Sequence, residues 1–110
     1  MKGTYLGEFE EIVLLAVGIL FDTAYGVSIC KEIESQCARS VNIGAVHTAL
    51  HRLEEKGFLK SRFGEATDVR GGKRKRLFTL TPYGIKALRE AQELRSNMWS
   101  QLPEAILQSN

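Results

Sequence analysis

The chain has 110 residues, enough for one domain with a hydrophobic core and too few for two. Its composition is that of an ordinary soluble globular protein, with 44% hydrophobic and 25% charged residues. The longest apolar stretch, residues 12–21, is too short to span a bilayer, and no basic segment with a cleavage site precedes it. Membrane insertion and export are therefore not indicated, and we expect a cytoplasmic protein.

The first two predicted helices have apolar residues at the helical period. One runs from Leu6 to about Phe21, and the second from near Tyr25 to about Ala38. We expect the inner face of the second helix to carry Val27, Cys30, Ile33 and Cys37. The two cysteines are seven residues apart on one helix, too far to bridge, so they are predicted to be reduced and buried, with a redox sensor as the alternative.

A third helix is predicted between Asn42, a good N-cap, and Gly57, which follows its last periodic residue. One stripe of it is apolar and consists of Ile43, Val46, Leu50 and Leu53. The opposite side carries small and polar residues, namely Gly44, Ala45, Thr48, His51 and Arg52. Such a face can approach a nucleic-acid groove closely, although Gly44 could equally serve packing against the second helix.

Two short strands are predicted next, over residues 58–63 and 75–80, as an antiparallel hairpin with an exposed loop. Every non-glycine residue from Arg70 to Arg76 is basic: Arg70, Lys73, Arg74, Lys75 and Arg76. This run carries +5 whereas the whole chain carries only +2, so the positive field is local. Beside the third helix it indicates a nucleic-acid backbone as partner, and a solvated loop is the alternative.

The last predicted helix begins at Thr81-Pro82 and runs to about Leu102, before Pro103. Its apolar surface is wider than four short elements can cover, so a two-fold dimer through the first and last helices is expected. The residues predicted for this interface are Phe9, Leu88, Ala91, Leu94, Met98, Trp99 and Leu102. The alternative is that the helix folds back on the first helix of its own chain.

Together these elements predict a mainly α (α+β) winged helix-turn-helix: a three-helix core, a two-stranded β-wing and a C-terminal dimerisation helix. Residues 1–110 would form one domain, with the helix-turn-helix and wing over 6–80 and the dimerisation helix over 81–102. His47 and His51 have the spacing of two zinc ligands on one helix, but no third ligand is in the expected relation. No catalytic constellation, metal site or cofactor is predicted, so an enzyme is not expected.

The combination resembles the PadR family of winged helix-turn-helix transcriptional regulators. The resemblance covers about residues 6–94 and is most specific at Tyr25-Gly26, over residues 44–57 and in the Gly-Gly-basic stretch of the wing. The short C-terminal part is similar to the smaller branch of the family, which has a single dimerisation helix. The resemblance implies a homodimer, most often a repressor, that places its recognition helices in successive major grooves and its wings on the flanking backbone or minor groove.

Matching positions carry the DNA-contact roles that the resemblance implies. They are Tyr25 for the phosphate backbone, Asn42 and Gly44 at the start of the recognition helix, Thr48 and Arg52 on its exposed side, and Lys73 and Arg74 in the wing. The family usually has tyrosine where this chain has His47, a ring that still stacks and donates but whose charge depends on pH near neutrality. The base preference at that position is therefore open.

The predicted function is that of a sequence-specific DNA-binding regulator, a repressor, acting as a homodimer on a pseudo-palindromic operator. Its predicted partners are double-stranded DNA and a second copy of the chain. One alternative is a winged-helix interaction or dimerisation module that does not bind DNA. Another, which the resemblance implies, is a sensor that binds planar aromatic compounds at the dimer interface, with Met98 and Trp99 as ligand contacts.

Overall fold

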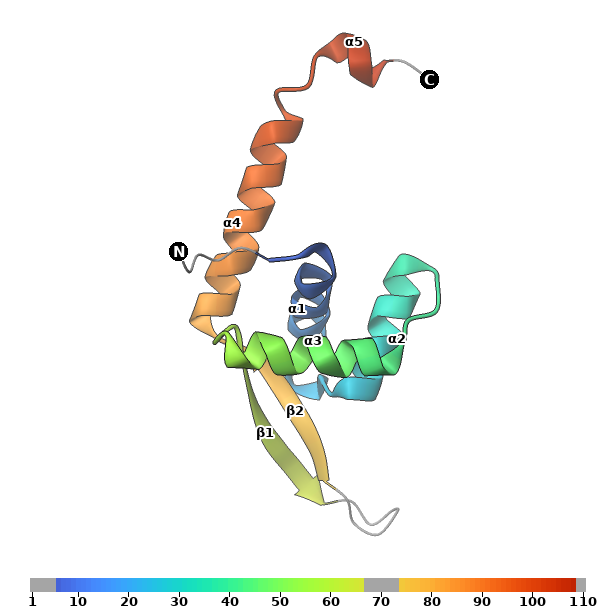
Figure 1. The fold of residues 1–110 in the computed structure, drawn as a ribbon, viewed down its shortest axis with the longest axis vertical. Coiled ribbons are helices and arrows are strands. Elements are labelled where there is room, and N and C mark those ends of the chain that lie inside the picture. Colours follow the sequence, from blue (N-terminus) through green and yellow to red (C-terminus); the bar gives the residue numbers. More distant parts are fainter. Residues whose placement is uncertain (1–5, 67–73, 109–110) are drawn as a thin grey trace.

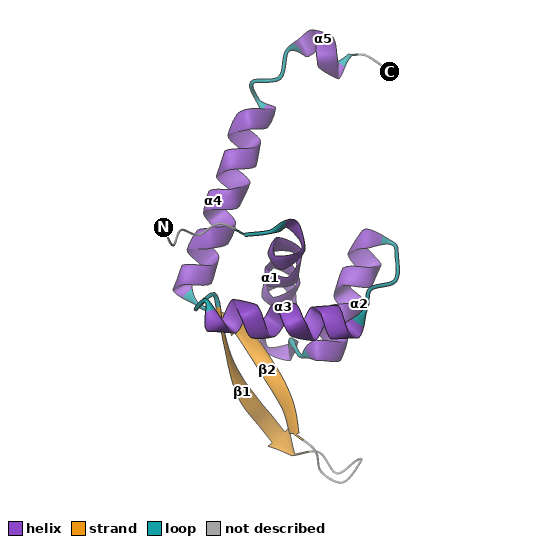
Figure 2. Ribbon diagram, viewed as in Figure 1, coloured by secondary structure: helices purple, strands orange, loops and turns teal. Residues whose placement is uncertain are grey.

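The structure is a computed structural model that describes residues 6–66 and 74–108, with overall dimensions of 60 × 34 × 20 Å. Within these residues the α-helices are α1 (Glu8–Leu20), α2 (Gly26–Cys37), α3 (Ile43–Glu55), α4 (Pro82–Trp99) and α5 (Glu104–Leu107). A 3-10 turn, η1 (Phe21–Thr23), links α1 to α2, and the strands β1 (Leu59–Ala66) and β2 (Arg74–Leu80) form an antiparallel hairpin. Figures 1 and 2 show the hairpin and α4 extending in opposite directions from the three-helix core. The predicted α+β winged helix-turn-helix is confirmed.

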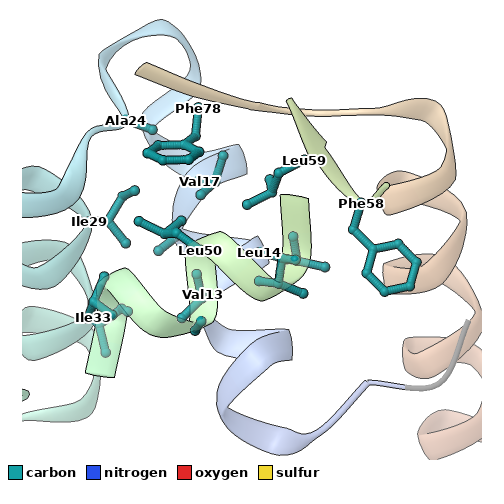
Figure 3. Packing of buried hydrophobic residues seen from close by; sticks show 14 of the residues in the cluster. Val13, Leu14, Val17, Ala24, Ile29, Ile33, Leu50, Phe58, Leu59 and Phe78 are labelled. Atoms are coloured by element: carbon teal, nitrogen blue, oxygen red, sulfur yellow. The ribbon is translucent and has the colours of Figure 1, made fainter. Parts of the chain in front are cut away.

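The core lies where α1, α2 and α3 meet the base of the hairpin (Figure 3). Its largest fully buried side chains are Phe58, Leu14, Ile29, Ile33, Leu50, Leu53, Val13, Val17 and Val46. The hairpin joins this core through Phe78, which is buried and donates its backbone N–H to Ala24 O at 2.8 Å. The base of the wing is therefore anchored in the core.

Two residues predicted for the core are exposed instead. Val27 is 47% exposed because the buried stripe of α2 is Gly26, Ile29, Cys30 and Ile33, a set with i, i+3, i+4, i+7 spacing that leaves Val27 to one side. Ile43 is 41% exposed because it lies one turn before Val46, at the very start of α3. Of the two cysteines predicted to be buried, Cys30 is buried and Cys37 is only half-buried. Burial raises the pKa of the Cys30 thiol, with the charge of Glu34 adding to the effect.

The junction between α3, β1 and α4 is held by a dense set of backbone hydrogen bonds. Gly57 has φ +85° and ends α3 in a Schellman motif, with Gly57 N donating to Glu54 O and Phe58 N to Leu53 O, each at 3.0 Å. Thr81 then returns to the same point: its Oγ1 donates to Gly57 O at 2.6 Å and its N to Phe58 O at 3.1 Å. The same hydroxyl accepts the N–H of Gly84 and caps α4.

Replacing Gly57 with alanine is expected to lower the free energy of unfolding by about 1 kcal/mol, because a Cβ is strained at positive φ. Asparagine tolerates this conformation better, so Gly57→Asn should lose less. Urea denaturation of the three proteins measures the difference. Equal stability of Gly57→Ala and the parent protein would contradict the assigned C-cap.

The C-terminal helix differs from its predicted extent. α4 ends at Trp99 rather than near Leu102, and a short helix α5 follows Pro103. The helical backbone conformation is disfavoured for the residue that precedes a proline. Leu102 precedes Pro103, so the helix ends before Leu102. On α4, Ala87 is fully buried, whereas Leu94 and Met98 are about 60% exposed. The second half of α4 thus extends away from the core, bound to α1 through an ion pair of 2.9 Å between Arg95 and Glu11.

Among the helices of residues 6–66 and 74–108, none is both long and apolar enough to cross a membrane.

Candidate nucleic-acid interface

The outer face of α3 is a ridge of small and polar residues, as predicted. Gly44, Ala45, Thr48 and Arg52 are all exposed on it. Asn42 caps the helix, its Oδ1 accepting the N–H of Ala45 at 3.1 Å. A Cβ added at Gly44 would meet that Oδ1 at 3.0 Å, with no α2 atom among its neighbours within 4 Å. The small residue therefore leaves the start of the helix open rather than allowing closer packing on α2.

The two histidines of α3 have different surroundings. The ring of His47 lies over the start of α2, since a Cβ added at Gly26 would be 2.5 Å from its Cε1. His51 is exposed one turn later, with Nε2 at 3.9 Å from Glu55 Oε2. In the described part of the chain no three His, Cys, Asp or Glu side chains are grouped as metal ligands. His47 is thus an outward-facing ring that also packs at the α2–α3 contact.

Arg52 belongs to a charged cluster that the sequence pattern did not indicate. Its Nη1 is 3.8 Å from Glu10 Oε2, and Lys56 Nζ is 3.4 Å from Glu10 Oε1. The Glu10 side chain is only 12% exposed and also accepts the N–H of Gly7 at 3.4 Å. The carboxylate therefore fixes the start of α1 against the end of α3, while the 61% exposed side chain of Arg52 remains accessible to a ligand.

The described cations of the wing are in three different environments. Arg74 is exposed near the end of the hairpin. Lys75 Nζ lies 4.2 Å from the centre of the Tyr25 ring, a cation–π contact that places Tyr25 beside the wing. Arg76 is bound to Glu54 and Ser61 at hydrogen-bond distance. Arg70 and Lys73 lie outside the described residues.

Two grooves border the exposed ridge of α3. One, of about 550 Å³, separates it from the wing and is lined by His47, Thr48, Leu50, His51, Arg52, Glu54, Glu55, Arg76 and Phe78. The other, of about 620 Å³, lies between α3 and the start of α1, where Thr48 and Arg52 again contribute. The ridge therefore projects between two hollows, a shape that suits insertion into a groove of a larger partner.

The sequence matches the family model of the transcriptional regulator PadR-like family over residues 14–90, from α1 into α4 and through the whole of the ridge and wing. The chain belongs to the PadR-like family. Comparison with curated proteins gives no match.

Solved structures of transcriptional regulators have the same fold. A PadR-like transcriptional regulator from Bacillus cereus superposes with a TM-score of 0.71 at 18% identity, covering 93% of each chain. A PadR family transcription regulator from Clostridium difficile has 26% identity and a TM-score of 0.62, covering 84% of this chain and 93% of its own. A transcriptional regulator from Clostridium thermocellum has 28% identity and a TM-score of 0.63, covering 84% and 90%. The protein is accordingly a PadR-like transcriptional regulator.

The residues predicted for a dimer interface follow one side of this PadR-like fold. Phe9, Leu88 and Ala91 are half-buried near the core. Toward the end of α4 and just after it, the exposed apolar residues are Leu94, Met98, Trp99 and Leu102, and α5 adds Ile106 and Leu107. The exposed apolar surface thus extends beyond the predicted set into a helix that sequence reasoning missed, because a four-residue helix has too few residues to show a period.

Proposed function

We propose that this PadR-like regulator binds DNA sequence-specifically as a homodimer and represses transcription from a pseudo-palindromic operator. The observation that carries the proposal is the exposed α3 ridge with Thr48 and Arg52, which lies between two grooves and beside the basic strand β2. A helix of this kind fits the major groove, where base edges present distinct donors and acceptors. The proposed site of its action is the cytoplasm.

Base recognition and phosphate binding are assigned to different parts of the surface. Thr48 and Arg52 are at the centre of the ridge and are assigned to base edges, with His47 and His51 beside them. The phosphate backbone is assigned to Tyr25, to Arg74 and Lys75 in the wing, and to the first turn of α3 that Asn42, Gly44 and Ala45 form. For Arg70 and Lys73 the phosphate role stays a prediction.

The proposed dimer forms through the apolar side of α4 together with α1. In one protomer Leu94, Met98 and Trp99 are all more than half exposed, and a second copy related by a two-fold axis would cover them. Such a dimer presents two α3 ridges to one face of a duplex, with half-sites about one turn apart, roughly 34 Å. Binding of planar aromatic compounds beside Met98 and Trp99 stays a prediction of the resemblance.

Selection from a randomised duplex pool, followed by salt titration of the selected and a scrambled duplex, tests the proposal. We expect a palindromic sequence and a steep negative slope of log K against log salt. Arg74→Ala should reduce that slope by about one unit with unchanged sequence preference, because it removes one phosphate contact. Thr48→Ala should leave the slope unchanged but reduce discrimination between the two duplexes by about 1 to 3 kcal/mol.

Two results would contradict the proposal. One is equally weak binding of the protein to selected and scrambled duplexes, which would remove the base-reading role of α3. The other is an undiminished preference in both Thr48→Ala and Arg52→Ala. An interaction module that does not use DNA would then be the better interpretation.

A further inference from the structure

Arg76 is bound within the protein by side chains from two other elements. Its Nη2 donates to Glu54 Oε1 at 3.1 Å and its Nε to Ser61 Oγ at 3.0 Å. The Ser61 hydroxyl in turn donates to the second carboxylate oxygen, Glu54 Oε2, at 2.7 Å. These three side chains form a closed ring of hydrogen bonds that joins the last turn of α3 to both strands of the wing. We name it the Glu54–Ser61–Arg76 cluster.

The strand register explains why Arg76 reaches this position. Ser61 pairs with Phe78 and Phe63 with Arg76, so the side chains of Ser61 and Arg76 are diagonal neighbours on one face of the hairpin. The guanidinium carbon is 5.8 Å from the ring centres of both Phe63 and Phe78. Phe78 is buried in the core, so Arg76 lies at the point where the wing extends from the core.

The cluster gives Arg76 a different electrostatic environment from that of its neighbours in the basic run. Glu54 is 29% and Arg76 48% exposed, so the pair is partly screened from water and the guanidinium charge is compensated. Lys75, by contrast, contacts an uncharged ring, and within the described residues no carboxylate forms an ion pair with Arg74 or Lys75. A guanidinium group whose N–H donors already bind a carboxylate is poorly available to a phosphate.

We propose that Glu54, Ser61 and Arg76 fix the orientation of the wing relative to the recognition helix, and that Arg76 is a positioning residue rather than a phosphate contact. The inference rests on the proposed DNA-binding function for its effect on affinity. A two-stranded hairpin is marginally stable by itself, so its direction has to be set by contacts at its base. A wing that is already oriented loses less conformational freedom on binding.

Affinity and its salt dependence distinguish the two roles of Arg76. We expect Arg76→Gln and Glu54→Gln each to weaken operator binding roughly fivefold, the scale of one partly exposed ion pair, and to leave the salt slope unchanged. The double variant should bind the operator no more weakly than either single variant, because the two single variants and the double variant all disrupt the same cluster. Arg74→Gln, the matched loss of a wing charge, should lower the slope by about one unit.

Glu54→Gln gives the sharpest contrast, because the alternative predicts the opposite sign. If Arg76 contacts phosphate, removing the competing carboxylate strengthens DNA binding. Glu55→Gln on the same turn is the control for the general loss of a negative charge near DNA, since Glu55 is exposed and paired only with His51 within the described structure. A slope lowered by one unit in Arg76→Gln, or a Glu54→Gln protein that binds at least as tightly as Glu55→Gln, would overturn the proposal.

Hydrogen exchange of the free protein tests the cluster without DNA. We expect faster exchange of β1 and β2 amides in Glu54→Gln and Arg76→Gln, an intermediate increase in Ser61→Ala, and parent-like rates in Arg74→Gln. Ser61→Ala removes two of the three hydrogen bonds of the ring but keeps the ion pair between Arg76 and Glu54, so it tests the cluster where a charge variant fails to fold. Unchanged wing exchange in the folded variants would overturn the positioning role. Failure of the parent protein to bind any duplex would instead contradict the proposed function and leave this measurement valid.

Discussion

Replacing Leu94 with glutamate is expected to convert the proposed dimer into a monomer and to weaken operator binding at least about 100-fold. Leu94 is 59% exposed in the protomer and lies along the apolar side of α4, so the substitution should not disturb the fold of one chain. In the dimer it would place a carboxylate in an apolar contact, which is strongly unfavourable. Losing the partner removes the second half-site, and linked binding contributes a factor on the order of 100 or more.

Sedimentation velocity and fluorescence anisotropy on the selected duplex measure the two effects of Leu94→Glu. Ser100→Glu is the matched control, because Ser100, the C-cap of α4, is exposed and lies about 100° or more around the helix from each α4 residue of the proposed interface, at roughly 100° per residue. It adds the same charge without entering the proposed interface. A Leu94→Glu protein that remains dimeric and binds with parent affinity would show that the subunits meet elsewhere.

Gly84→Ala is expected to destabilise the fold by about 3 kcal/mol, at the upper end of the usual range for overpacking. A Cβ at this position would lie 2.2 Å from the carbonyl oxygen of Phe58 and 3.1 Å from its carbonyl carbon. Both are backbone atoms at the start of β1, so α4 would have to move away from the strand. That movement would break the hydrogen bond from Thr81 N to Phe58 O and disturb the stacked rings of Phe58 and Tyr83.

Thermal and urea denaturation with circular dichroism would measure the loss of stability in Gly84→Ala. Gly18→Ala provides the control, since its added Cβ would meet the end of the Leu80 side chain at 3.0 Å, a group that can move. Alanine is also the better helix former by about 1 kcal/mol, so Gly18→Ala should be neutral or stabilising. Parent-like stability of Gly84→Ala would mean that α4 does not pack on Phe58 as described.

The elements of this fold could be predicted because their signals are local. Asn42 and Gly57 delimit α3, and Thr81-Pro82 marks the start of α4, each within a few residues of sequence. The inner face of α2 was less accessible to prediction because Gly26 is part of the buried stripe and carries no apolar side chain to reveal it. The pattern of apolar residues therefore indicated Val27 as a buried residue in place of Gly26.

The candidate site could be located from the sequence, but the partners of its charges could not. Arg76 is one of five cations in a short run, and nothing in the sequence of that run indicates that, of its described members Arg74, Lys75 and Arg76, only Arg76 binds a carboxylate. Glu54 is 22 residues away from it, and Glu10 and Lys56 are separated by 46. Such pairs depend on how α1, α3 and the wing pack together, which is a property of the tertiary structure and has no periodic signature.

The junction at Gly57, Phe58 and Thr81 has a consequence for allosteric control. It connects the end of α3, the base of the wing and the start of α4 through three backbone hydrogen bonds and one from the Thr81 hydroxyl, so we expect these elements to move together. In the proposed dimer, a rotation of one α4 against the other would be transmitted through this junction to both recognition helices. A signal received at the subunit contact could then change the distance between two DNA-reading surfaces while leaving each of them intact.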